Sequence, residues 1–243
     1  MLHTTKGIVI HQFKYGEKSV IAKIYTEKFG LQSYIINGVR SKKSTNKFAY
    51  LQPLSLVEIN VYHKENKGLQ HLKSIKLDIS FQYIPFDVYK GSIAFFVAEV
   101  IYKTIKEEEA NSELFDFLYN SVQVLDVTKK NHANFHVYFL TLFAKYLGFP
   151  PQSTVVETTK TVYFDLQEGM FCLIKPFHQA YLETEASLVL LTIIQTHYQE
   201  IETISIGGKL RATLLQGLLD YYKIHAVNFD TLKTKEVLEE LFV

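Results

Sequence analysis

The stretch KGIVIHQFKYGEKSVIAKIYTEKFGLQSYIINGVR, Lys6–Arg40, decides the fold of the first part of the chain. Its β-branched and aromatic residues alternate with polar ones, and turn residues interrupt them at Tyr15-Gly16 and Phe29-Gly30. A period of two, rich in β-branched residues, favours strands over helices. The stretch therefore predicts three consecutive strands joined by tight turns.

Two more alternating stretches carry the same pattern to about residue 80. Five strands are expected: Lys6–Phe13, Ser19–Thr26, Leu31–Val39, Leu54–His63 and Leu69–Leu77. Five short strands without intervening helices indicate a small Greek-key barrel such as an OB-fold. An SH3-like barrel gives the same pattern, and the pattern alone does not separate the two.

The apolar period changes to 3.6 from about Val88, which predicts helices in the rest of the chain. The first helix ends at the acidic run Glu107–Glu109, the second is capped by Asn111 or Ser112, and the third runs from His132 to a stop at Gly148. Three more are expected over Glu183–Gln199, Lys209–His225 and Thr231–Leu241.

A short hairpin interrupts the helices. It pairs Thr161–Asp165 with Gly169–Ile174, and its core is expected to contain Val162, Phe164, Phe171 and Leu173. The sequence therefore predicts a multidomain protein of the α+β class. A five-stranded barrel over residues 1–80 precedes an all-helical domain over residues 81–243, which carries a small insertion at about 153–176.

Composition excludes several classes of protein. Aromatic residues make up 14% of the 243 residues and the net charge is only +1, unlike a disordered chain. The single cysteine, Cys172, excludes an intramolecular disulfide and a multi-cysteine metal site, and a buried, inert thiol is expected. No apolar run is long enough to span a membrane, and residues 1–6 lack a signal pattern, so we expect a cytoplasmic protein.

The near-neutral total hides a strong asymmetry of charge. Residues 1–80 carry 13 Lys or Arg against five Asp or Glu, a net charge of +8, and the remainder carries a net −7. Such asymmetry favours a polyanionic partner for the barrel. The alternative is a lysine-rich surface that is merely solvated.

The basic residues concentrate in the segment Arg40–Pro53, between the third and fourth expected strands. Four cations there can contact phosphates: Arg40, Lys42, Lys43 and Lys47. For the neighbouring Phe48 and Tyr50 we expect a role in anchoring the segment to the barrel. Stacking on unpaired bases is the alternative.

Motifs of the common enzyme classes are absent from the sequence. There is no GxxxxGK[ST] phosphate loop, no GxGxxG after a strand, no HExxH and no GxSxG. His132 and His136 share a helical spacing, but no third ligand accompanies them. We therefore expect no enzyme activity, no catalytic residue, no metal and no cofactor.

The opening stretch strongly resembles the start of the RecO family of DNA repair proteins. The family's strand "KGIVL", its "YGE" turn, its "T-E-GL" segment and its basic "GVR" are matched by Lys6–Ile10, Tyr15–Ser19, Thr26–Leu31 and Gly38–Arg40. Gln52-Pro53-Leu54 matches its "LQPL", and Leu147–Pro151 resembles its helix stop. Leu210-Arg211, Tyr221-Tyr222, His225 and Leu232–Thr234 resemble its terminus.

The resemblance implies an N-terminal OB-fold, a helical C-terminal domain and a recombination mediator that is not an enzyme. Such proteins bind single- and double-stranded DNA, anneal complementary strands and engage RecR and the C-terminal tail of single-stranded-DNA-binding protein. They thereby help to load the RecA recombinase, and no membrane is involved. Many members carry four zinc-binding cysteines after the helix stop. This chain has only Cys172 there, so we expect a degenerate zinc-finger-like insertion without zinc.

These considerations select two sets of binding residues. The residues expected to contact phosphate are Lys14, Lys18, Arg40, Lys42, Lys43 and Lys47. Lys209 and Arg211, at the start of an apolar helix, are candidates for contacting the acidic tail of single-stranded-DNA-binding protein, and the alternative is that they are ordinary surface residues. Two other functions stay open: a generic OB-fold binder of single-stranded nucleic acid, and a protein-interaction scaffold.

The basic segment gives the first test. Replacing Arg40, Lys42, Lys43 and Lys47 together with alanine should weaken DNA binding and flatten its dependence on salt. With fewer phosphate contacts, binding releases fewer counterions from the DNA. Fluorescence titrations at several salt concentrations measure both quantities. Unchanged affinity at moderate salt would remove the DNA-binding role from this segment.

Overall fold

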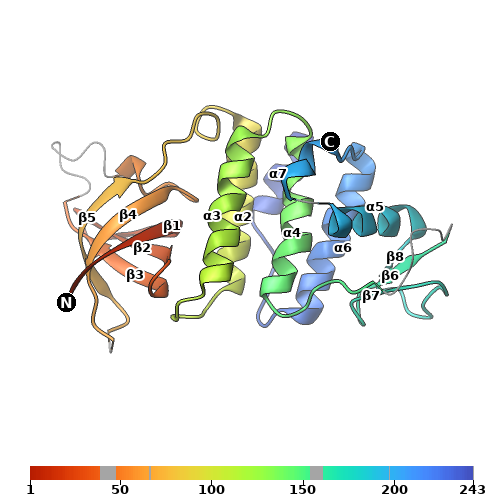
Figure 1. Ribbon diagram of the computed structural model, residues 1–243, viewed down its shortest axis with the longest axis horizontal. Helices are drawn as coiled ribbons and strands as arrows, with labels where there is room; N and C mark the ends of the chain where they lie inside the picture. Colours follow the sequence, from red (N-terminus) through yellow and green to blue (C-terminus); the bar gives the residue numbers. More distant parts are fainter. Residues whose placement is uncertain (39–47, 66, 154–160, 197, 243) are drawn as a thin grey trace. The chain divides into compact units, whose positions relative to one another are not determined.

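The computed structural model describes residues 1–38, 48–65, 67–153, 161–196 and 198–242, without the side chains of residues 198 and 199. The chain forms two compact units, Met1–Val127 and Thr128–Val243 (Figure 1). The boundary between these units falls after the second long helix. The sequence-based division after the barrel, at residue 80, stays a prediction.

The first unit begins with a closed five-stranded barrel, as predicted. Its strands are β1 (Leu2–Tyr15), β2 (Ser19–Thr26), β3 (Gly30–Ile36), β4 (Leu56–Tyr62) and β5 (Gln70–Leu77). Their order around the barrel is β1-β2-β3-β5-β4, and β3 and β5 run parallel. This closed Greek-key order is that of an OB-fold, so the structure resolves the alternative that the sequence pattern left open.

The strand β1 closes the barrel because it pairs with two neighbours. Its first half, Leu2–Ile8, pairs with β4, and its second half, from Gly7 onward, pairs with β2. An irregularity between Val9 and His11 marks the change of partner. There the backbone N–H of Val9 donates to the carbonyl of Ser55 at 3.0 Å, and the N–H of Leu54 donates to the carbonyl of Val9 at 2.7 Å. The buried Leu54 adopts a left-handed φ of 63°, which these two bonds hold in place.

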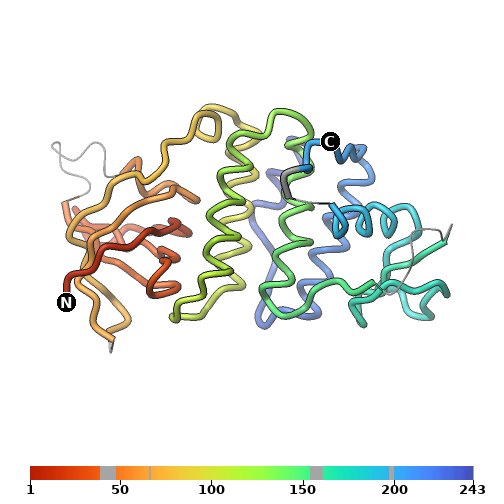
Figure 2. The backbone as a smooth tube through the Cα atoms, in the orientation of Figure 1, coloured from red at the N-terminus to blue at the C-terminus, as the bar shows by residue number. Residues whose placement is uncertain are grey.

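Two helices complete the first unit: α2 (Val88–Thr104) and α3 (Ser112–Val127) (Figure 2). The carboxylate of Asp126 at the end of α3 accepts the backbone N–H groups of Gln82, Tyr83 and Ile84 at 2.8–2.9 Å. The buried ammonium of Lys90 in α2 donates to the carbonyl of Asp126. This network fixes the segment between the barrel and α2 to both helices.

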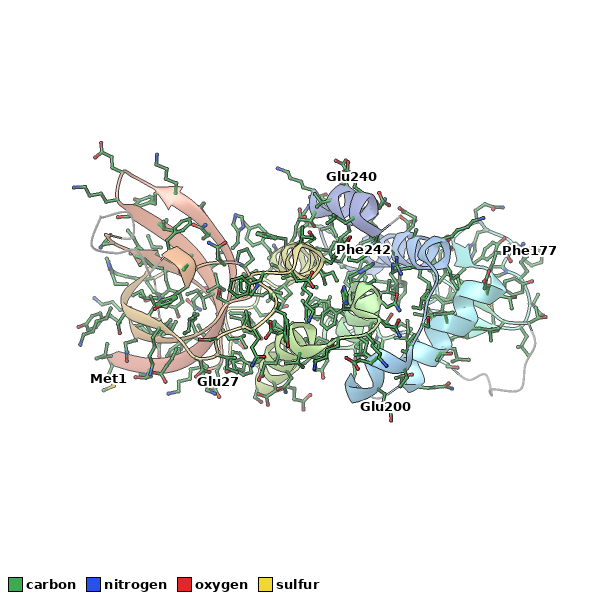
Figure 3. All side chains as sticks on the ribbon, turned by 90° about the horizontal axis from the view of Figure 1, so that it is seen from above. Met1, Glu27, Phe177, Glu200, Glu240 and Phe242 are labelled. Carbon is green, nitrogen blue, oxygen red and sulfur yellow. The ribbon has the colours of Figure 1, made fainter. Side chains whose placement is uncertain are left out.

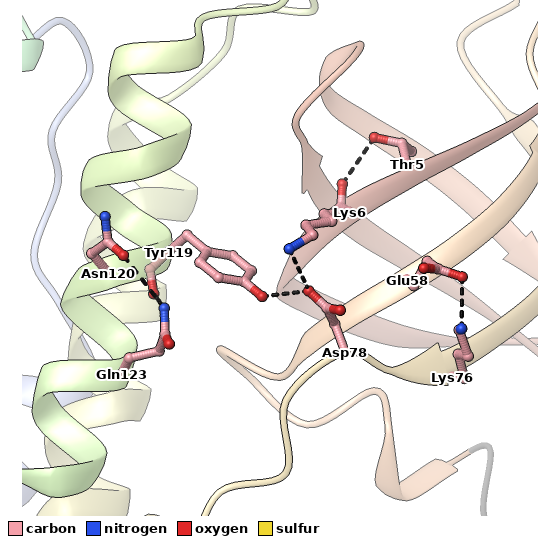
Figure 4. Close-up of polar contacts among 8 residues, drawn as sticks. All are labelled: Thr5, Lys6, Glu58, Lys76, Asp78, Tyr119, Asn120 and Gln123. Atoms are coloured by element: carbon pink, nitrogen blue, oxygen red, sulfur yellow. Dashed lines mark hydrogen bonds and ion pairs between the residues drawn. The ribbon is translucent and has the colours of Figure 1, made fainter.

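The barrel is joined to α3 by a second polar contact. The Tyr119 hydroxyl donates to the carboxylate of Asp78, which also pairs with the Lys6 ammonium at 3.2 Å (Figure 4). Although burial alone raises the pKa of Asp78, the hydrogen bonds from Tyr119 and Lys6 lower it below its usual value. The Lys6 ammonium also lies 5.1 Å from the centre of the Tyr119 ring.

The turn before β3 fits closely against the acidic segment that follows α2. Gly30 has a left-handed φ of 60°, and a Cβ atom at this position would lie 2.2 Å from the carbonyl oxygen of Glu109. The N–H of Leu31 donates to the carbonyl of Glu107 at 3.0 Å, which extends the hydrogen bonding of β3 into this segment. Gly30 is therefore required both by its conformation and by the space around it.

The second unit is helical with a small sheet. Its elements are η1 (His132–Asn134), α4 (Phe135–Tyr146), β6 (Tyr163–Asp165), β7 (Met170–Cys172), β8 (Tyr181–Leu182), α5 (Thr184–Gln195), η2 (Tyr198–Thr203), α6 (Gly208–His225) and α7 (Thr234–Phe242). Phe139, Phe143 and Tyr222 are buried where α4 packs against α6, and the Tyr222 hydroxyl donates to the carbonyl of Leu140 at 2.7 Å. The helix α4 ends at Tyr146, and Gly148, the predicted stop, follows two residues later with a positive φ of 90°.

The predicted hairpin is present, but three details differ from the prediction. A third strand, β8, joins β6, so the sheet order is β7-β6-β8. Val162, Phe164 and Phe171 are buried as expected, whereas Leu173 is 54% exposed because it lies one residue beyond β7. Cys172 is half-buried rather than buried, and the loss of solvent raises the pKa of its thiol.

Gly30 and Gly16, two of the glycines with left-handed φ, give a matched test of the fold. Around Gly16, φ 64°, no atom lies within 4 Å of an added Cβ atom. We expect Gly16→Ala to cost only the conformational strain, about 1 kcal/mol of the free energy of unfolding. Gly30→Ala adds a clash with backbone and should cost about 3 kcal/mol or more. Urea denaturation measures both, and equal losses would contradict the close packing described for Gly30.

Candidate nucleic-acid interface

Two cations of the barrel are already neutralised within the protein. Lys6 pairs with Asp78 as described, and the Lys76 ammonium lies 2.9 Å from the Glu58 carboxylate (Figure 4). Both lysines add to the net charge of the domain, but a phosphate group would have to compete with a carboxylate for each of them. They are therefore poor candidates for contacting DNA.

The hairpin between β1 and β2 carries two lysines that, unlike Lys6 and Lys76, are not paired with a carboxylate in the described part of the chain. Lys14 and Lys18, both predicted to contact phosphate, are exposed. Within the described parts of the chain, no carboxylate oxygen lies within 4.0 Å of either ammonium. Phe13 is 42% exposed and Tyr15 is 50% exposed on the same hairpin. Exposed rings beside cations are the combination that binds single-stranded nucleic acid, through stacking and phosphate contact.

A further group of cations surrounds Tyr102 in the last turn of α2, where that helix packs against β1. The ring of His11 in β1 lies 4.8 Å from the ring of Tyr102. The ammonium groups of Lys23 and Lys106 lie 5.7 and 5.5 Å from its centre. We call His11, Lys23, Tyr102 and Lys106 the Tyr102 cluster. Register brings it together, because His11 and Lys23 are direct partners between β1 and β2.

The Tyr102 cluster brings two ammonium groups close together, with the carboxylates of Glu99 and Glu107 acting on the same residues. Burial and the neighbouring Lys23 cation lower the pKa of His11, although Glu99 opposes this. Burial and the cations of Lys23 and Lys103 lower the pKa of Lys106, although Glu107 opposes this. Burial is the larger cause of both shifts and the neighbouring cations add to it, so the charged forms of His11 and Lys106 are disfavoured here.

Sequence reasoning missed the Tyr102 cluster. Lys103 and Lys106 are visible as basic residues at the end of a helix, but only the packing of α2 on β1 places them beside His11 and Lys23. The free cations on the barrel and this cluster lie on elements of one compact unit. Lys14 and Lys18 were predicted to contact phosphate, and Lys23 and Lys106 are two further cations that the sequence analysis did not select.

The predicted basic segment lies mostly outside the described residues. Arg40, Lys42, Lys43 and Lys47 all belong to residues 39–47, so their contribution stays a prediction. Tyr50 packs against the core of the barrel, as expected for an anchor. Phe48, for which the same role was expected, is 38% exposed.

The second set of predicted residues lies at a pocket in the second unit. Lys209 is exposed, and no ion pair with it is found in the described part of the chain. Arg211 is partly buried and is more than a surface residue. Its guanidinium donates to the side-chain oxygen of Asn134 at 3.2 Å and to the carbonyls of Ile206 and Phe242 at 3.1 and 2.9 Å.

The pocket beside these cations has a volume of about 300 Å³ and a mainly apolar lining. Its walls are His136, Gly208, Lys209, Arg211, Ala212, Leu215, Leu238, Glu239 and Phe242. Burial and the nearby Arg211 cation lower the pKa of His136 to about 3, so this histidine is neutral at physiological pH. An apolar pocket beside two permanent cations suits an anionic peptide with apolar side chains.

Two other features bear on function. Among the described residues, no group of three or more His, Cys, Asp or Glu side chains is arranged to hold a metal ion. None of the described helices combines the length and the apolar character needed to cross a membrane.

Comparison with known proteins gives the family. The family model described as "Recombination protein O N terminal" matches residues 1–81, and "Recombination protein O C terminal" matches residues 85–233. Proteins named DNA repair protein RecO are similar over the whole chain: that of Bacteroides fragilis is 35% identical and that of Phocaeicola vulgatus 34%, each with full coverage of both chains. That of Flavobacterium psychrophilum is 38% identical, with 98% of both chains covered. The barrel, the helical second part and these similarities together show that the chain belongs to the RecO family of DNA repair proteins.

Proposed function

We propose that the protein is a recombination mediator that acts in the cytoplasm without catalysing a reaction. It binds single- and double-stranded DNA, anneals complementary strands and helps to load recombinase onto DNA coated by single-stranded-DNA-binding protein. The observation that carries this proposal is a set of cations on the first unit, Lys14, Lys18 and the lysines of the Tyr102 cluster. Among the described residues none of them forms an ion pair with a carboxylate, and the Lys106 ammonium donates only to the carbonyl of Tyr102, at 3.0 Å.

Annealing follows from backbone recognition. Two complementary strands repel each other through their phosphates, and a cationic surface reduces that repulsion. The exposed rings of Phe13 and Tyr15 can hold unpaired bases by stacking, which does not depend on sequence. Base pairing between the two strands then supplies the sequence selection, so the protein needs no contacts that read bases.

The protein partners are part of the same proposal. We assign the pocket beside Lys209 and Arg211 to the tail of single-stranded-DNA-binding protein, which the family resemblance describes as acidic with an apolar end. RecR is the second partner and RecA is reached indirectly. A generic binder of single-stranded nucleic acid without mediator activity is the alternative, and strand-annealing assays on DNA coated by single-stranded-DNA-binding protein separate the two.

The Tyr102 cluster gives a test of DNA binding. We expect Lys23→Ala with Lys106→Ala to weaken binding of labelled single-stranded DNA and to reduce the slope of log affinity against log salt by about 1.4, since each phosphate contact contributes about 0.7. Lys14→Ala with Lys18→Ala should act in the same way. Fluorescence anisotropy at several salt concentrations measures the slope.

Lys76→Ala is the matched control for these variants. It removes one exposed lysine from the same barrel, but that lysine is already paired with Glu58. We expect its salt slope to stay within error of the wild-type value. The double variant removes two lysines and Lys76→Ala removes one. If Lys76→Ala reduced the slope by half as much as the double variant, the general charge of the barrel rather than the Tyr102 cluster would explain binding.

The pocket in the second unit is tested with a peptide that carries the tail of single-stranded-DNA-binding protein. We expect Lys209→Glu and Arg211→Glu each to raise the dissociation constant at least about tenfold, because either change repels the acidic peptide. Lys223→Glu, on the last turn of α6, is the control. Isothermal titration calorimetry measures the constants, and unaltered binding by Lys209→Glu would reject this pocket, whatever Arg211→Glu does to folding.

A further inference from the structure

The helix α7 is short and weakly held. Of its nine residues only Leu238 is fully buried, and Val237 is 48% exposed. A helix of this length is unstable alone in water, so its helical state depends on docking to the rest of the second unit. Elements with little buried apolar surface open at low free-energy cost.

The end of α7 docks on Arg211. One guanidinium nitrogen of Arg211 donates to the carbonyl of Phe242, and the Phe242 ring lies 5.5 Å from the guanidinium carbon. The same ring lies 6.0 Å from the ring of His136. Phe242 and Glu240, which mark the end of this helix, are labelled in Figure 3. The last turn of α7 is therefore held by the cation that was predicted to bind a partner.

This docking leaves the groove incompletely filled. The pocket of about 300 Å³ lies between α7 and the surface formed by α4 and α6, with Leu238 and Phe242 on one side and Leu215 and Ala212 on the other. The pocket opens to solvent, so part of its apolar lining is left uncovered by α7. A different segment with larger or additional apolar side chains would gain contacts there.

The composition of α7 is complementary to the groove in charge. The helix carries Glu236, Glu239 and Glu240 against a single Lys235, and it ends in Leu241-Phe242. Its Lys235 is partly neutralised by Glu239, at 3.0 Å. The groove contributes the cations of Lys209 and Arg211. The segment that covers the pocket is thus itself an acidic peptide with an aromatic end.

We propose that α7 is an autoinhibitory latch. It occupies, within the same chain, the groove that otherwise receives an acidic partner peptide with an apolar, aromatic end, and such a peptide displaces it. The partner's aromatic ring takes the place of Phe242 on Arg211, and an apolar side chain takes the place of Leu238. The inference rests on the proposed function of this pocket, and it adds the regulation of that site.

The latch predicts how the apparent affinity for a peptide depends on the docking of α7. When only a fraction of molecules has an open groove, the apparent affinity for a peptide falls by that fraction. Changes that loosen α7 but leave the side of the groove formed by α4 and α6 intact should therefore tighten peptide binding. This sign is the opposite of that expected if α7 merely completes the wall of the pocket, because loosening a wall weakens binding.

The test uses the full chain and a labelled peptide of sequence TKEVLEELF, that of residues 234–242. Leu238→Ala and Phe242→Ala loosen the latch, and Val237→Ala, at an exposed position of the same helix, is the control. We expect the two loosened variants to bind the peptide at least about tenfold more tightly than the wild-type chain, and the control to match the wild type. Equal or weaker binding by both loosened variants would overturn the latch.

Two further measurements separate failure of the latch from failure of the pocket. If Lys209→Glu abolishes peptide binding but the loosened variants bind like the wild type, the pocket stands and the latch is wrong. If no chain binds the peptide, both proposals fail. Hydrogen exchange on the wild-type chain needs no variant: added peptide should speed exchange of amides 236–242, and unchanged or slower exchange there would overturn displacement.

Discussion

The double pairing of β1 is the constraint on which the first unit depends. One strand of 14 residues binds β4 with its first half and β2 with its second, and this closes the barrel. The irregularity between Val9 and His11 lets the strand change partners, and the Leu54 turn fills the hydrogen bonds that become available. The same register sets His11 beside Lys23 on the surface that receives α2. The candidate nucleic-acid interface is therefore a consequence of how the barrel closes.

Charge on this unit has two distinct environments. Lys6 and Lys76 are paired with carboxylates and contribute to the structure, whereas the cations around Tyr102 lie near one another, with an aromatic face between them. Attraction between the cations and the ring offsets part of the mutual repulsion. Burial, and after it the remaining repulsion, lowers the pKa values of His11 and Lys106. Binding of backbone phosphate by this cluster is part of the proposed function and stays a prediction.

Much of the fold could be predicted because its signals are local. Period-two patterning and turn glycines identified all five barrel strands, and Gly148 identified the end of α4. The strand β8 was not predicted, because two residues carry no periodicity. Leu173 was wrongly placed in a core, since a one-residue difference in where a strand ends changes the exposure of the next side chain.

The candidate sites were harder to predict because they depend on contacts distant in sequence. Lys14 and Lys18 were found from charge alone, and both are exposed. The Tyr102 cluster needs the packing of α2 on β1, which no local pattern specifies. Arg211 was selected as a cation near an apolar helix, but its three hydrogen bonds and its contact with Phe242 are known only from the folded chain.

The most direct measurement is the salt dependence of single-stranded DNA binding by the unmodified protein. Four cations form no ion pair with a carboxylate among the residues that the structure describes: Lys14, Lys18, Lys23 and Lys106. They predict a slope of log affinity against log salt of about −3 or steeper, at about 0.7 per phosphate contact. A linear slope of that size supports recognition of the backbone by the first unit. Binding that is absent at low salt, or that does not change with salt, would contradict it.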